Sequence, residues 1–112
     1  MGDKLTAELM IMSGPDDGKT IFLSDPKQGG EAYIIGRRDD CDVILPYDSQ
    51  ISRQHARLFR KDNQWCLQDL GSRNGTYLGK QKIEGVASVA PGQMFRIGRT
   101  WLRLQDSGAG GR

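Results

Sequence analysis

The sequence predicts an all-β fold: an antiparallel β-sandwich of about ten or eleven short strands, with its binding loops clustered at one end. Three observations lead to this prediction. Apolar residues occur in short runs or alternate with polar residues, which is the pattern of half-buried strands. These runs are evenly spaced and separated by turn residues, and 15 of the 112 residues are glycine. No segment shows the periodicity of a helix over a useful length.

Ten strands can be placed in order, and each is bounded by turn residues. Their expected ranges are 6–12, 19–23, 31–36, 43–45, 55–61, 64–70, 76–78, 81–83, 93–97 and 100–105. Pro46 closes the fourth strand, and Asp62-Asn63 turns the fifth strand into the sixth. Pro91-Gly92 suits a tight turn, because proline presets the first central position and glycine accepts positive φ at the second. The ladder of short strands therefore continues to the end of the last hairpin.

Length and composition predict one domain over residues 6–106, followed by a flexible Gly-rich tail or linker over residues 107–112. The net charge of +2 is too small to indicate a nucleic-acid or membrane partner by itself. No apolar run is long enough to span a bilayer, and no secretory signal is evident. We therefore expect a cytoplasmic domain without membrane insertion.

The two cysteines and one histidine do not predict a cofactor or metal site. Cys41, Cys66 and His55 fall short of the four closely spaced ligands of a structural zinc site. In a reducing compartment the two cysteines are not expected to form a disulfide. We expect no cofactor and no bound metal.

Three loops carry residues suited to binding an anion: Gly36-Arg37, the Ser52–His55 segment and the Ser72–Gly75 segment. Each loop places a guanidinium, hydroxyl or carboxamide group beside a residue that favours a tight turn. Each also lies where an apolar strand begins or ends, and loops on a rigid β scaffold are where binding residues concentrate. A site with these donors and no paired acid and base suits a multi-oxygen anion better than a reaction.

Two enzyme-like patterns are not supported by their context. Residues 14–20 resemble a nucleotide-binding loop, but only three residues separate the glycines and a strand follows where a helix is needed. Ser52, His55 and Asp69 supply the residue types of a hydrolase triad, but the chain has no nucleophile elbow to present the serine. We expect a protein that is not an enzyme.

Taken together, Gly-Arg, Ser-x-x-His and Asn-Gly in this order resemble the forkhead-associated (FHA) domain, a reader of phosphothreonine peptides. The resemblance runs from about Leu9 to Leu104. It implies that Arg37 and Ser52 contact the phosphate, that Arg53 and Arg73 add contacts, and that Asn74 grips the ligand main chain. It also implies supporting roles for Gly36, His55 and Gly75, with His55 architectural rather than catalytic.

The expected partner is a phosphothreonine-containing protein or peptide, a substrate of a Ser/Thr kinase, and the isolated domain is expected to be monomeric. The phosphorylated segment could belong to another protein or to the parent chain itself. Two alternatives stay open. One is a scaffold that binds unphosphorylated protein surfaces through the sheet or the same loops. The other is nucleic-acid binding. The sequence shows neither an exposed aromatic ladder nor a recognition helix in its favour.

Overall fold

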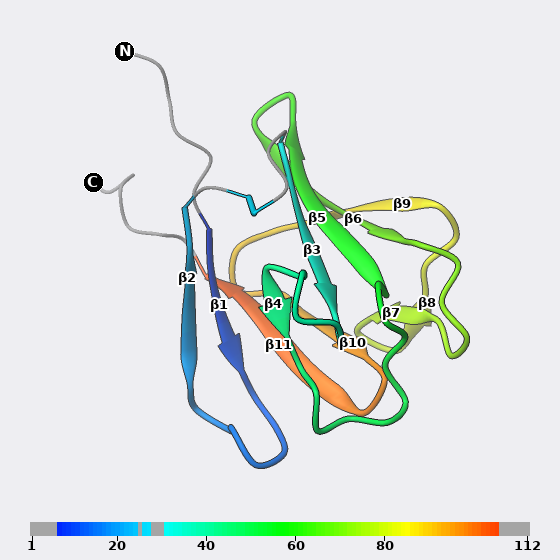
Figure 1. Ribbon diagram of the computed structural model, residues 1–112. Helices are drawn as coiled ribbons and strands as arrows, with labels where there is room; N and C mark the ends of the chain where they lie inside the picture. Colours follow the sequence, from blue (N-terminus) through cyan, green and yellow to red (C-terminus); the bar gives the residue numbers. More distant parts are fainter. Residues whose placement is uncertain (1–6, 25, 28–30, 106–112) are drawn as a thin grey trace.

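In a computed structural model, which describes residues 7–24, 26–27 and 31–105, the chain forms two packed β-sheets (Figure 1). One sheet has six strands in the order β2-β1-β11-β10-β7-β8, and the other has five in the order β4-β3-β5-β6-β9. The strands are β1 (Ala7–Ile11), β2 (Thr20–Leu23), β3 (Ala32–Gly36), β4 (Val43–Ile44), β5 (Ala56–Lys61), β6 (Gln64–Asp69), β7 (Thr76–Leu78), β8 (Gln81–Lys82), β9 (Val86–Val89), β10 (Met94–Ile97) and β11 (Thr100–Gln105). The described residues contain no helix, so the all-β prediction is confirmed.

The core lies between the two sheets, because alternate residues along each strand point inward. Strand β11 shows the pattern most clearly: Thr100, Leu102 and Leu104 are buried, and the residues between them are half-buried. The largest fully buried side chains are Tyr33, Phe95, Leu9, Ile11, Ile35, Leu45, Ile51, Leu58, Leu67, Ile97, Leu102 and Leu104. Each such side chain stabilises the fold by about 1.5–3 kcal/mol relative to exposure. Together they hold the strand ends, and hence the loops, in fixed positions.

The predicted strands agree with the structure to within a few residues, with two differences. Strand β9 was not predicted, because only Val89 of its four residues is buried and the alternation is too short to stand out. Strand β4 pairs with β3 in parallel, whereas the sequence predicted antiparallel neighbours. The Asp42 carboxylate accepts hydrogen bonds from Ile34 N and Lys27 N, which directs the chain back alongside β3. The remaining strand pairs are antiparallel.

Some predictions lie outside the described residues. These are the domain limits at residues 6 and 106 and the tail over residues 107–112. Within the described residues, no helix is long and apolar enough to cross a membrane.

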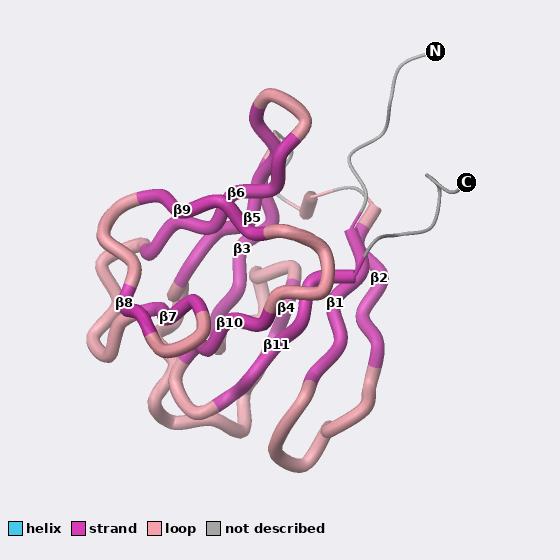
Figure 2. Tube along the Cα trace, turned by 180° about the vertical axis from the view of Figure 1, so that it is seen from behind, coloured by secondary structure: helices cyan, strands magenta, loops and turns pink. Residues whose placement is uncertain are grey.

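The loops after β3, β4 and β6 meet at one end of the sandwich (Figures 1 and 2). The β4–β5 loop is held there by Asp48, a buried carboxylate. Its oxygens accept hydrogen bonds from Gln50 N, Arg99 N and Thr100 Oγ1 at 2.7–2.9 Å. These bonds connect the loop to the β10–β11 turn, so the loop is supported from the opposite sheet.

Candidate functional site

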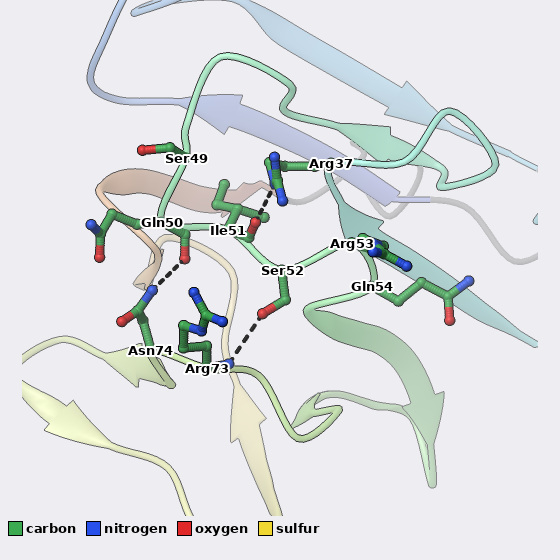
Figure 3. Close-up of a pocket in the computed structure, with 9 residues that line it drawn as sticks. All are labelled: Arg37, Ser49, Gln50, Ile51, Ser52, Arg53, Gln54, Arg73 and Asn74. Atoms are coloured by element: carbon green, nitrogen blue, oxygen red, sulfur yellow. Dashed lines mark hydrogen bonds between the residues drawn. The ribbon is translucent and has the colours of Figure 1, made fainter.

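All five residues predicted to bind the ligand line a single open pocket of about 380 Å³ at this end of the sandwich (Figure 3). They come from three loops that are far apart in the sequence. The residues that line the pocket are Arg37, Ser49, Gln50, Ile51, Ser52, Arg53, Gln54, Arg73 and Asn74. Ser49, Gln50, Ile51 and Gln54 were not predicted as binding residues. The structure therefore brings the predicted donors together and adds polar neighbours from the same loop.

Gly36 allows the β4–β5 loop to approach β3 closely. A Cβ at this position would lie 2.0 Å from Arg53 O, so the approach requires glycine. The Arg53 carbonyl oxygen lies within hydrogen-bond distance of three donors: Arg37 N at 3.1 Å, Arg38 N at 3.3 Å and Cys41 Sγ at 3.2 Å. The predicted role of Gly36 was to let the chain leave the sheet. Strand β3 does end at Gly36, and the structure adds a close contact between its backbone and that of the β4–β5 loop.

The Arg37 side chain is anchored at one end and exposed at the other. Its Nε donates a hydrogen bond to Ile51 O at 2.5 Å, which fixes the guanidinium across the β4–β5 loop. An ion pair with an acidic neighbour such as Asp40 would occupy its terminal nitrogens. However, Asp40 pairs with Arg38 at 3.0 Å, and among the described residues Arg37 makes no ion pair. The terminal nitrogens of Arg37 are therefore available at the pocket.

Two hydrogen bonds join the β4–β5 and β6–β7 loops across the pocket. Ser52 Oγ accepts a bond from Arg73 N at 3.1 Å, and Asn74 Nδ2 donates to Gln50 O at 2.8 Å (Figure 3). Because the Ser52 oxygen acts as an acceptor here, its hydroxyl hydrogen can still be donated to a ligand. Asn74 likewise keeps Oδ1 as an acceptor. These bonds join the two loops into one connected surface.

His55 is fully buried and supports both loops at once. Its Nδ1 accepts a hydrogen bond from Ser52 N at 3.0 Å, and its Nε2 lies 2.8 Å from Gly75 O. The first bond requires an unprotonated Nδ1, so Nε2 carries the proton and donates to Gly75. Burial lowers the pKa of His55, against the opposing effects of the Gly75 carbonyl and Asp69, which favours this neutral form.

Gly75 supports the site in two ways: its φ of +83° forms the tight turn, and its carbonyl receives the bond from His55. A side chain would be strained at this φ, and a Cβ would also lie 2.8 Å from Lys82 Cε. The predicted residues Gly36, His55 and Gly75 thus all lie directly beneath the pocket residues.

Asp69 organises the β6–β7 loop and was not predicted to do so. Its carboxylate accepts hydrogen bonds from Gly71 N, Ser72 N, Ser72 Oγ and Thr76 Oγ1, at 2.5–3.0 Å. Ser72 Oγ in turn accepts a bond from Gly75 N at 2.9 Å. Burial alone would raise the pKa of Asp69, but the hydrogen bonds from Ser72 and Thr76 outweigh it and lower the pKa. The Asp-x-x-Ser spacing before a turn was the available sequence signal.

The contacts of Ser52, His55 and Asp69 differ from those of a hydrolase triad. Ser52 meets the imidazole through its backbone N–H, while its Oγ bonds to the third loop. His55 Nε2 donates to Gly75 O and lies 4.0 Å from Asp69 Oδ1. Both imidazole nitrogens therefore take part in holding loops.

The pocket presents positive charge to solvent. The guanidinium groups of Arg37, Arg53 and Arg73 are exposed around it, whereas the nearby carboxylates of Asp48 and Asp69 are occupied by hydrogen bonds to the loops. Backbone and side-chain donors surround a space suited to a small anion with several oxygens.

A β-sandwich that carries hydrogen-bond donors on loops at one end is a β-sandwich binding module. Comparison with known proteins identifies its family. The FHA domain profile matches residues 33–98. The FHA domain-containing protein FhaB of Mycolicibacterium smegmatis is 37% identical over 98 residues, which cover 88% of this chain and 59% of FhaB.

Two solved structures have the same fold. The FHA domain of CT664 from Chlamydia trachomatis gives a TM-score of 0.76 at 32% identity, covering 90% of this chain and 97% of that one. A structure from a study of phosphothreonine-dependent FHA domain interactions gives a TM-score of 0.74 at 27% identity, covering 90% of this chain and 96% of that one. This chain belongs to the FHA domain family. It spans about three fifths of the length of FhaB.

Proposed function

We propose that this chain is a non-catalytic signalling module that binds phosphothreonine-containing segments of a partner protein. The binding residues are Arg37, Ser52, Arg53, Arg73 and Asn74. The observation that carries the proposal is their convergence on one cationic pocket, with donors already held in place by hydrogen bonds between loops. A likeness to structures of phosphothreonine-dependent FHA interactions supports it.

Arg37 and Ser52 are the principal phosphate ligands in this proposal. A phosphothreonine carries close to two negative charges and three strong acceptor oxygens. Arg37 donates from its terminal nitrogens, and Ser52 donates its hydroxyl hydrogen. Each charge-assisted hydrogen bond contributes about 1.5–3 kcal/mol, so three or four of them, reduced by association costs, give about micromolar affinity.

The remaining three residues contact the ligand around the phosphate. Arg53 and Arg73 are exposed at the rim and add positive charge next to the phosphate. Asn74 holds the peptide backbone beside the phosphorylated residue, because its Oδ1 can accept from a peptide N–H. The preference for threonine over serine follows the family, since one buried methyl group adds only about 0.8 kcal/mol.

We further infer that the isolated domain is monomeric and cytoplasmic, acts without catalysis, and reads the product of a Ser/Thr kinase. The engagement of both His55 nitrogens in loop support argues against an acid–base role. The domain would attach the protein that carries it reversibly to a phosphorylated protein, or to a phosphorylated segment of the same protein.

A titration with a phosphothreonine peptide and its unphosphorylated twin tests the proposal. We expect amide shifts at Ser52, Arg53 and Asn74 with the phosphopeptide only. Arg37→Ala should weaken binding by more than about tenfold, because it removes at least one charge-assisted bond. Arg60→Ala, which removes an exposed arginine at the end of β5, is the matched control and should bind normally. Equal binding of both peptides would favour the scaffold alternative instead.

A further inference from the structure

A row of alternating aromatic and cationic residues crosses the outer face of the six-stranded sheet. Strand pairing places Trp101 of β11 opposite Arg96 of β10, Arg96 opposite Tyr77 of β7, and Tyr77 opposite Lys82 of β8. The neighbours of these residues along β7, β10 and β11, such as Ile97, point into the core, so the row faces outward. We call Trp101, Arg96, Tyr77 and Lys82 the aromatic–cation row.

Arg96 is fixed in the middle of this row. Its guanidinium carbon lies 4.2 Å from the centre of the Tyr77 ring and 5.9 Å from that of the Trp101 ring. Its Nη1 donates a hydrogen bond to Gly98 O at 2.7 Å. A guanidinium held in this way loses little freedom when a carboxylate binds its remaining donors.

A second cation lies beside the row on the same face. Arg103 stands between Met94 and Met10, and its guanidinium bonds to Gln105 Oε1 at 2.7 and 3.1 Å. Among the described residues, neither Arg96 nor Arg103 forms an ion pair. The surface thus combines half-buried aromatic and methionine side chains with two guanidinium groups that have no carboxylate partner in the described part of the chain.

The apolar character of this face extends to the edge of the sheet. Phe22 of β2 is 76% exposed, the largest exposure among the bulky apolar residues described. It lies opposite Glu8, the one acidic residue on the described part of this face. A ligand that complements the face would carry carboxylates near Arg96 and Arg103 and an apolar group near Phe22.

The row also begins beside the candidate phosphate site. Strand β7 starts immediately after Gly75, and the Lys82 side chain lies next to that glycine. Tyr77 is three residues from Asn74, a distance of at most about 10 Å along an extended chain. A few residues of a peptide held by Asn74 are therefore enough to reach the row.

We propose that this face binds an acidic, apolar-containing segment of the same partner polypeptide that carries the phosphothreonine. The inference rests on the proposed function. Charge complementarity with Arg96 and Arg103 selects the acidic segment. A single-stranded nucleic acid fits less well, because Arg96 already covers one face of Tyr77 where a base would stack.

The test compares a short phosphothreonine peptide with two longer ones, which carry an acidic tract containing leucine and phenylalanine before or after the phosphothreonine. We expect one extension to increase the affinity of the wild-type domain about fivefold, or about 1 kcal/mol. Arg103→Gln and Arg96→Gln should each remove this gain. Arg57→Gln is the matched control, because Arg57 also stacks on an aromatic ring, Phe59 at 4.3 Å, but on the opposite sheet.

A second measurement separates this inference from the proposed function. The acidic tract alone, without phosphate, should shift the Trp101 indole N–H signal and the Arg103 amide. That result would support the face even if the short phosphopeptide failed to bind. The inference is wrong if neither extension changes the affinity, if Arg57→Gln removes the gain as well, or if a random oligonucleotide shifts Trp101 at lower concentrations than the acidic tract.

Discussion

Replacing Gly36 with alanine should move the backbone of residues 52–54 and weaken phosphothreonine-peptide binding. A Cβ at residue 36 would lie 2.0 Å from Arg53 O and 3.0 Å from Cys41 Sγ. A carbon and an oxygen in close contact lie about 3.3 Å apart, so the carbonyl would have to retreat by about 1.3 Å. Relaxation of a flexible side chain cannot relieve this clash, because the atom in the way belongs to the main chain.

The retreat would separate the Arg53 carbonyl from its donors at Arg37 N, Arg38 N and Cys41 Sγ. Together with overpacking, these losses should lower the free energy of unfolding by about 2–4 kcal/mol. Ser52 and Arg53 would move with the carbonyl, away from the Arg37 guanidinium. Misalignment of even one charge-assisted phosphate bond reduces affinity about tenfold.

Urea unfolding gives the stability, and calorimetric titration at low temperature gives the affinity of the folded variant. Gly79→Ala is the matched control, because Gly79 has φ +61° but no heavy atom within 4 Å of a Cβ. It should lose about 1–2 kcal/mol of stability through backbone strain alone and keep normal affinity. A folded Gly36→Ala variant with unchanged affinity would refute the reasoning.

Four further outcomes are expected. Asp69→Ala should lower the free energy of unfolding in urea by about 3 kcal/mol, because Ser72 and Thr76 lose a charged acceptor; a loss no greater than that of Asp62→Ala on the β5–β6 turn would contradict this. Because burial lowers the pKa of His55 in the folded state, stability should be full above the ordinary value of 6.5 and fall as the pH drops below it, towards the lower folded pKa; a flat urea midpoint between about pH 7 and pH 5 would exclude this effect. Asn74→Ala should weaken phosphopeptide binding by about 1–2 kcal/mol while phosphate alone, followed by Ser52 amide shifts, binds as before; an equal loss for both ligands would show that Asn74 acts on the phosphate instead. Cys41→Ala should weaken phosphopeptide binding more than Cys66→Ala does in the same calorimetric titration, because only Cys41 bonds to Arg53 O; equal affinities would exclude a role for this bond.

The strands could be predicted from the sequence because their residues alternate locally between core and solvent. The missed strand, β9, has no such pattern: Val86 is 51% exposed, and the strand is defined by pairing with β6 instead. The parallel pairing of β4 was missed for a similar reason. Its direction depends on the Asp42 carboxylate reaching Ile34 N, a contact that a local pattern does not encode.

The candidate binding residues could be predicted because each occurs in a short motif next to a strand end. The residues that hold the binding loops in place were predicted less completely, because their contacts depend on distances across the fold. Asp48, for example, meets Arg99 N and Thr100 Oγ1 about fifty positions later in the chain. The aromatic–cation row could not be predicted either, since Tyr77 and Trp101 flank Arg96 only after three strands pair.

The hydrogen bonds between the pocket loops use groups that a phosphate does not need. Ser52 contributes an acceptor to Arg73 N, and Arg37 contributes its Nε to Ile51 O. A dianion requires donors only, and the donors that remain on these two side chains are the Ser52 hydroxyl hydrogen and the terminal nitrogens of Arg37. Hydrogen bonds within the domain can therefore order the loops without using the donors that the ligand needs. Because little ordering is left for the binding step, we expect a few contacts to suffice for the proposed reversible, micromolar interaction.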